Sequence, residues 1–163
     1  MKRLLVVFHS MTGGARQMAE AVLRGATSEP GVQTRLLRAG DAKAPDVLEA
    51  DGYVFVTPEN LAAMSGLMKD FFDRTYYAAL DRISGRPYAT LVCAGSDGEN
   101  AVRQVERICT GWRLKAVCDP IIVCTHAQTP EAILAPKTIG PEDLKRCEDT
   151  GAAIAAGLAL GVF

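Results

Sequence analysis

The residues best suited to chemistry form a short loop between an apolar segment and an amphipathic one. They are Ser10, Met11, Thr12, Gly13, Gly14, Ala15 and Arg16. Hydroxyl groups can donate hydrogen bonds to an anion, and glycines let backbone amides approach it closely. If a helix begins here, its free amides and the positive end of its dipole attract a phosphate. The loop has neither the lysine of a GxxxxGK[ST] pattern nor GxGxxG, so a monoester phosphate fits it better than a nucleoside triphosphate or a dinucleotide.

The same loop also has a purely structural interpretation. Ser10 or Thr12 can cap a helix while the glycines form a turn. Arg16 can pair with a phosphate or with Glu20, which lies one helical turn further on. The residues alone leave these alternatives open.

Two more loops follow apolar segments and open helices. The stretch 57–66 combines a stiffening proline, an asparagine able to bond a planar heterocycle, and an apolar shelf, whereas 94–100 is rich in glycine and polar residues. Both also have a structural interpretation, in which Ser65 and Asp97 only cap the helices that follow. The residues of these loops that we expect at a binding site are Thr57, Pro58, Glu59, Asn60, Leu61, Gly95, Asp97 and Gly98.

Other chemistries find little support. The five cysteines, at positions 93, 109, 118, 124 and 147, include no CxxC pair, so zinc-ribbon and iron–sulfur sites are not expected. No set of histidines, cysteines and carboxylates has metal-ligand spacing, and we predict no metal. Ser10 lacks the GxSxG context of a hydrolase. His9 is expected to be structural, and His126 is only a minor candidate for contact with a substrate.

Composition narrows the class of protein further. The 18 Lys+Arg and 19 Asp+Glu residues give a net charge of −1, which leaves no basic surplus for binding nucleic acid. The start of the chain lacks the pattern of a signal peptide, and the apolar stretch 151–163 is shorter than the ~20 residues that cross a bilayer. We therefore expect a cytoplasmic protein with no nucleic-acid or membrane partner.

Apolar runs alternate with segments of helical periodicity along the chain. The expected strands are 4–8, 32–37, 53–56, 88–93 and 116–124, and the expected helices are 14–28, 45–50, 67–76, 101–112 and 142–160. The stretch 125–141 reads as a loop rich in Thr and Pro. Strands separated by helices predict one α/β domain over residues 1–163, with a parallel sheet covered on both faces. Pro120 places the fifth strand at an edge or at a bulge.

In such a sheet, ligands bind beyond the carboxyl ends of the strands, where the three loops lie. Loops of these kinds at these places resemble those of the flavodoxin-like superfamily. The most specific match is Ala50–Pro58 continuing to Met64–Lys69, which is similar to NAD(P)H-dependent FMN reductases and flavodoxin-like quinone oxidoreductases. The resemblance extends over most of the chain and implies a three-layer sandwich with five parallel strands in the order 2-1-3-4-5.

The resemblance also implies a function. FMN would bind with its phosphate in the first loop and its ring between the other two, and NAD(P)H would be the co-substrate. We expect an FMN-containing oxidoreductase that passes electrons from NAD(P)H to a small acceptor such as a quinone. Two alternatives remain: a flavodoxin-type electron carrier, and a binding module of this fold without turnover. No catalytic side chain is assigned, because the flavin itself does the chemistry.

The sequence departs from the family in its aromatic residues. Neither 57–64 nor 94–100 contains an aromatic side chain to stack on a flavin ring, and Glu59 and Leu61 stand where quinone oxidoreductases usually carry an aromatic residue or an arginine. Each missing stacking partner forfeits about 1 kcal/mol of contact with the ring. Weak retention of FMN, or completion of the site by a second copy of the chain in a homo-oligomer, would follow.

Overall fold

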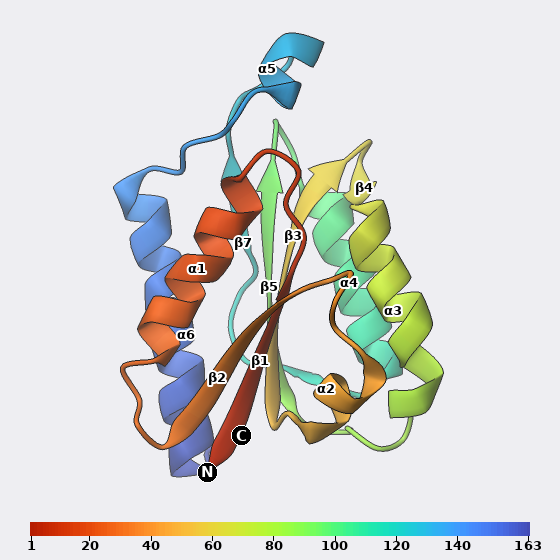
Figure 1. The fold of residues 1–163 in the computed structure, drawn as a ribbon, viewed down its shortest axis with the longest axis vertical. Helices are drawn as coiled ribbons and strands as arrows, with labels where there is room; N and C mark the ends of the chain where they lie inside the picture. Colours follow the sequence, from red (N-terminus) through yellow and green to blue (C-terminus); the bar gives the residue numbers. More distant parts are fainter.

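Strands and helices alternate along the chain in the computed structural model, which describes all residues from Met1 to Phe163 (Figure 1). The strands are β1 (Lys2–Phe8), β2 (Val32–Arg38), β3 (Gly52–Asn60), β4 (Ala63–Met64), β5 (Pro87–Ala94), β6 (Lys115–Ala116) and β7 (Ile121–Cys124). The helices are α1 (Gly14–Ala26), α2 (Ala44–Glu49), α3 (Gly66–Ala79), α4 (Glu99–Gly111), α5 (Pro130–Leu134) and α6 (Pro141–Leu160).

The sheet has the topology expected from the sequence. Its strands follow the order β2-β1-β3-β5, and β6 and β7 both pair in parallel with β5 at the far edge. Val6 of β1 lies opposite Leu36 and Val54, which fixes the register of the three neighbouring strands. With β6 and β7 taken together as the fifth parallel strand, the order 2-1-3-4-5 is confirmed, and the fold class is α/β of the flavodoxin-like kind.

Two predictions for the strands and the loops between them need correction. The expected strand 116–124 is interrupted between β6 and β7. The amide of Val117 still donates to the carbonyl of Tyr88 at 3.2 Å, but residues 118–120 make no ladder pair, and Pro120 has no amide proton to offer. The expected loop 57–66 is mostly a β-hairpin, since β3 runs on to Asn60 and turns into the antiparallel strand β4. Ser65 caps α3 as predicted, and its Oγ accepts a hydrogen bond from the amide of Met68 at 3.3 Å.

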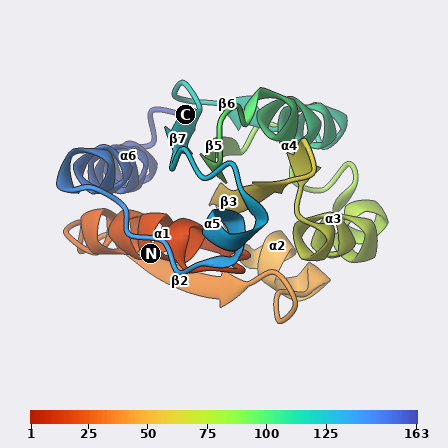
Figure 2. The ribbon, with the colours of Figure 1, turned by 90° about the horizontal axis from the view of Figure 1, so that it is seen from above.

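Alternate side chains of the buried strands face two separate cores. Leu4, Val6 and Val54 pack under α1 and α6, whereas Leu5 and Phe55 face α2, α3 and α4 on the other side. Figures 1 and 2 show these two helical layers on either side of the sheet. The sandwich therefore buries both faces of its central strands, as their continuous apolar sequences predicted.

Helices α1 and α6 approach each other closely. A Cβ atom added at Gly25 would overlap the carbonyl oxygen of Glu148, and one added at Gly151 would overlap that of Val22. Glycine is required at both positions because the backbones occupy the space of a side chain. This contact fixes α1, and with it the loop that precedes α1.

All the parallel strands end at the same side of the sheet. The loops after β1, β3, β5 and β7 meet there, and Figure 2 shows α5 lying over this end of the sheet. Helix α5 falls in a stretch expected to be a loop, although Thr129 caps it through its side chain and Pro130 occupies its first turn, which are ordinary signs of a helix start. None of the helices combines the length and apolar character needed to cross a membrane.

Candidate flavin-binding crevice

A crevice of about 720 Å³ opens at the carboxyl ends of the strands. Four segments line it: the loop after β1, the β3–β4 hairpin, the loop after β5, and the stretch from Thr125 to Lys137. The lining residues are Ser10, Met11, Thr12, Gly14, Ala15, Pro58, Glu59, Asn60, Leu61, Cys93, Ala94, Gly95, Ser96, Thr125, Ala127, Gln128, Ile133 and Lys137. Ten of the residues predicted from the sequence are therefore brought together in one place.

The first loop has a backbone shape that glycine makes accessible. Gly13 precedes α1 with φ 97°, in the left-handed region that other residues rarely adopt. The Oγ of Ser10 accepts a hydrogen bond from the amide of Gly13 at 3.0 Å, and the amide of Gln17 donates to the carbonyl of Gly13 at 3.1 Å. The loop is thus closed upon itself before α1 begins.

The next amides are free. Gly14, Ala15 and Arg16 form the first turn of α1, and their N–H groups donate to no backbone or side-chain acceptor. Such unpaired amides at a helix start attract an anion. Gly14 lies directly over Cys93, and a Cβ atom at Gly14 would come within 2.5 Å of the Cys93 sulfur. A side chain here would push the loop off the sheet, so the free amides depend on this glycine.

Arg16 does not enter the crevice. Its guanidinium is exposed and its Nε lies 3.8 Å from Glu20 Oε1, one turn further along α1. Of the two partners weighed for Arg16, the structure places it beside Glu20. Arg16 and Gly13 instead line a neighbouring hollow of about 590 Å³, which shares Ser10, Met11 and Thr12 with the crevice.

His9 is one of the residues that line this neighbouring hollow. Its Nδ1 is buried and has no hydrogen-bond partner. Burial lowers the pKa of the imidazole below its usual value, because a charged ring would lose its hydration there. At neutral pH, His9 therefore adds a neutral polar ring and not a positive charge.

The β3–β4 hairpin forms the second wall and carries local strain. Its tip consists of Leu61 and Ala62, both with positive φ (51° and 62°), between the paired residues Asn60 and Ala63. A two-residue turn with positive φ at both positions usually contains Asn-Gly. Leu61 is fully exposed at the tip.

Three hydrogen bonds hold this hairpin on the start of α4. Glu59 Oε2 accepts from the amide of Gly98 at 2.5 Å, and the side chain of Asn100 donates to the carbonyl of Ala62 at 2.6 Å. The amide of Met64 donates to Gln104 Oε1 at 2.9 Å. These contacts offset the strain of the tip and fix the wall before any ligand arrives.

Three further predicted site residues lie outside the crevice. Thr57 is fully buried, and its Oγ1 accepts from the amide of Ser65 at 3.1 Å, so it fixes the base of the hairpin. Gly98 is buried behind the loop, where it holds Glu59, while Asp97 is exposed and accepts from the amide of Glu99 at 3.2 Å. Asp97 thus stabilises the start of α4 through its side chain. The N-cap residue of α4 is Gly98, whereas the structural interpretation predicted Asp97.

The stretch after β7 completes the crevice and was not identified from the sequence. Within this stretch, the amide of His126 donates to the carbonyl of Gly95 at 2.8 Å. The side chain of His126 is exposed and does not line the crevice. Further on, Ile133 and Lys137 face the first loop. The available signal was positional: a loop after the fifth strand must emerge at the same end of the sheet as the others.

The chemistry of the lining fits a phosphorylated, largely apolar ligand. Free amides, the hydroxyls of Ser10 and Thr12 and the ammonium of Lys137 lie around the first loop, and apolar side chains such as Met11, Leu61 and Ile133 line the crevice as well. No aromatic side chain lines the crevice. Burial raises the pKa of the Cys93 thiol to about 11 despite the nearby charge of Lys137, so this thiol stays protonated at neutral pH.

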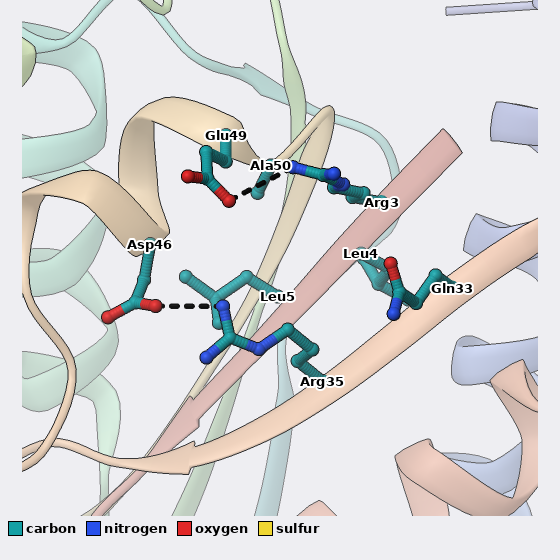
Figure 3. A pocket seen from close by; sticks show the side chains of 8 residues that line it. All are labelled: Arg3, Leu4, Leu5, Gln33, Arg35, Asp46, Glu49 and Ala50. Atoms are coloured by element: carbon teal, nitrogen blue, oxygen red, sulfur yellow. Dashed lines mark hydrogen bonds and ion pairs between the residues drawn. The ribbon is translucent and has the colours of Figure 1, made fainter. Parts of the chain in front are cut away.

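A smaller hollow of about 260 Å³ lies near the amino ends of β1 and β2, away from the crevice. Figure 3 shows Arg3 turned toward Glu49 and Arg35 toward Asp46, at 2.9 and 2.8 Å. Both arginines are paired, so the hollow presents no free charge for a ligand. No cluster of three or more His, Cys, Asp or Glu side chains is arranged to hold a metal ion.

The sequence model of a family described as NADPH-dependent FMN reductase matches residues 3–128. The chain is 36% identical over 96 residues to a flavodoxin of Aquifex aeolicus, covering 59% of this chain and 50% of the relative. It is 35% identical over 95 residues to an NAD(P)H dehydrogenase (quinone) of Acidithiobacillus ferrooxidans, covering 46% and 48%. The chain thus spans about half the length of these curated relatives.

Solved structures resemble the whole fold. A flavodoxin from the domain Archaea superposes with a TM-score of 0.77 at 21% identity, covering 96% of this chain and 98% of the other. A WrbA-like flavodoxin from Agrobacterium tumefaciens superposes with a TM-score of 0.72 at 18% identity, covering 99% of both chains. At these identities, the likeness supports the fold alone. Any function has to be argued from the residues of the crevice.

Proposed function

Because the chain belongs to the NADPH-dependent FMN reductase family, we propose that it binds FMN in the crevice and passes electrons from NAD(P)H to a small acceptor such as a quinone. The observation that carries this proposal is the first turn of α1. Its amides at Gly14, Ala15 and Arg16 are free, and Gly14 and Ala15 line the crevice together with the hydroxyl residues Ser10 and Thr12. This is a donor set for a monoester phosphate at the edge of a crevice large enough for a flavin.

Bound FMN would supply the redox chemistry, by taking up a hydride and releasing its electrons to the acceptor. The chain's own contribution is to hold and orient. The amides of α1 hold the phosphate, and the Ser10 hydroxyl keeps the Gly13 amide in place. The hairpin residues Pro58 and Asn60 and Gly95 of the loop after β5 line the crevice and would border the ring.

Only two charged side chains line the crevice, Glu59 and Lys137. Glu59 is the one carboxylate in the lining, and its Oε2 is engaged by the amide of Gly98, which offsets its negative charge. Cys93 is protonated at neutral pH and brings no charge. Backbone amides pointing into a partly dry crevice stabilise negative charge that develops on a reduced ring. No side chain of the crevice needs to act as a nucleophile.

The proposed acceptor class rests on the relatives. Two curated relatives are named NAD(P)H dehydrogenase (quinone). The border of the crevice is apolar at Met11, Leu61 and Ile133, which suits a small planar acceptor with little charge. The identity with a protein named flavodoxin favours a second candidate, an electron carrier that uses the same bound FMN without direct turnover of NAD(P)H.

A turnover assay separates these functions. Purified protein reconstituted with FMN is mixed with NADH or NADPH and a soluble benzoquinone, and the absorbance of the nicotinamide is followed. The proposal predicts steady consumption that requires protein, FMN and quinone together. Bound FMN with no consumption of either nicotinamide would favour the carrier. Protein that stays colourless after incubation with FMN would refute both and leave a binding module of this fold.

A further inference from the structure

The loop after β1 brings no cation of its own to the crevice. Its single basic residue, Arg16, is exposed and lies beside Glu20. The cation that does line the crevice is Lys137, which is 125 positions away from Thr12 along the chain. The fold therefore supplies the lysine that the loop sequence lacks.

The backbone fixes Lys137 in this place. Its amide donates to the carbonyl of Thr12 at 2.9 Å, and its carbonyl accepts from Gln17 Nε2 at 2.7 Å. The same Gln17 accepts from the amide of Ile139 at 3.0 Å through Oε1. Three hydrogen bonds thus tie the segment around Lys137 to the first loop and to α1, so the lysine is positioned independently of its side-chain charge.

The ammonium of Lys137 forms hydrogen bonds with carbonyl groups at the end of α5. Its Nζ donates to the carbonyl oxygens of Ala132 and Ile133 at 2.8 Å and of Ala135 at 2.5 Å. These carbonyls lie in the last turn of the helix and just beyond it, where partners within the helix run out. Thr12 Oγ1, on the rim of the free amides, lies 3.5 Å from the same Nζ.

We propose that Lys137 is the specificity-determining residue that makes the crevice select a flavin with a phosphate over the same flavin without one. The inference rests on the proposed function, because it assumes that a flavin binds here. An ammonium has three protons, and all three are directed to carbonyls of one segment. A phosphate on the amides beside Thr12 would draw one of these hydrogen bonds to itself, since a bond between two charged groups is stronger than one to a carbonyl. The remaining two keep α5 over the crevice.

The test compares FMN with riboflavin, which differs only by the phosphate. Dissociation constants for both are measured by quenching of flavin fluorescence on the full chain, in the wild type, in Lys137→Met and in Lys137→Arg. Lys115→Met is the matched control, because Lys115 is exposed in β6 and lines neither hollow. Loss of a charge-assisted hydrogen bond is expected to weaken FMN about ten- to hundredfold in Lys137→Met.

The proposal predicts that riboflavin affinity changes less than about threefold in every variant, and that Lys137→Arg keeps most of the preference for FMN. Equal weakening of both flavins in Lys137→Met would overturn it, since Lys137 would then only hold α5 in place. Unchanged FMN affinity would overturn it as well. Wild-type protein that binds neither flavin would refute the proposed function itself, which is a different result.

A second measurement needs no variant. In the wild type, added salt is expected to weaken FMN much more than riboflavin, because ions screen the pairing of ammonium and phosphate. The same salt dependence for both flavins would contradict a role for the charge of Lys137.

Discussion

Gly13 offers a substitution that separates charge from backbone strain. Its φ of 97° is unfavourable for any side chain, whereas a Cβ atom there would meet nothing closer than Gln17 Nε2 at 3.7 Å. Gly13→Asp and Gly13→Asn therefore introduce side chains of equal size into the same open but strained position. Strain of this kind costs about 1–2 kcal/mol per residue, and slightly less for Asn and Asp. Both variants are expected to fold, with a Tm lowered by about 2–6 °C.

The two variants differ in charge at the start of α1. The carboxylate introduced by Gly13→Asp would lie beside the free amides of α1, where a negative charge adds about 0.3–1 kcal/mol of stability in the absence of ligand. The same carboxylate would repel a phosphate. Two unit charges about 4 Å apart interact by about 4 kcal/mol at an effective dielectric constant of ~20, and solvent exposure reduces this value. We expect Gly13→Asp to lose about 2 kcal/mol of binding free energy relative to Gly13→Asn, or about thirtyfold in the Kd of FMN.

We therefore expect the two variants to rank in opposite orders in thermal stability and in affinity for FMN. Thermal unfolding without ligand should rank Gly13→Asp at or above Gly13→Asn, while titration with FMN should rank it far below. Riboflavin, which has no phosphate, should bind the two variants alike. If FMN bound both variants equally well, the phosphate would not lie at the start of α1, and the assignment of the first loop would be wrong.

Three further outcomes follow from the structure. Replacing the strained tip Leu61-Ala62 by Asn-Gly should raise the Tm by about 2–4 °C in a thermal melt, because these residues adopt positive φ at lower cost. Gly25→Ala should lower the free energy of unfolding by about 1–3 kcal/mol in urea titration, since its Cβ would overlap the carbonyl of Glu148 and force α1 from α6. His9→Gln should reduce the loss of unfolding free energy that the wild type shows as the pH falls below about 6.5. Because burial lowers the pKa of His9 in the folded state, the unfolded chain binds this proton more tightly. The contribution of neutral His9 to stability is therefore fully present above the unfolded pKa of about 6.5 and is lost as the pH falls through that value. An unchanged Tm for the first, an unchanged midpoint for the second, or the same pH dependence in wild type and variant for the third would contradict the respective argument.

The sequence predicted the layered fold because its signals are local. Continuous apolar runs such as Leu4–Phe8 and Tyr53–Val56 indicate strands buried on both faces, and the periodic segments between them require helical crossovers. The first loop was predictable for the same reason. Its hydroxyls and glycines lie within the five residues from Ser10 to Gly14, and the helix that orients its amides begins within the loop.

The hairpin was missed because its tip carries no local turn signal. Leu61 and Ala62 are not turn residues, and the hairpin is held by Glu59, Asn100 and Gln104 through contacts with α4. Tertiary hydrogen bonds thus override what the tip residues prefer. A single sequence gives no means of pairing residues about 40 positions apart.

Lys137 was missed for a related reason. Its importance lies in its closeness to Thr12 in space, whereas the two residues are 125 positions apart in sequence. Within 125–141 the lysine is one polar residue among many in a stretch that reads as a loop. Only the carboxyl-end rule for parallel sheets pointed to this stretch, and that rule selects a loop without selecting a residue.

A crystal structure of the chain grown with FMN would test the proposed phosphate site at the start of α1. We expect density for the phosphate on the amides of Gly14, Ala15 and Arg16, with the ring lying between the β3–β4 hairpin and the loop after β5. A flavin whose phosphate lies elsewhere, or a crevice that stays empty at saturating FMN, would contradict it.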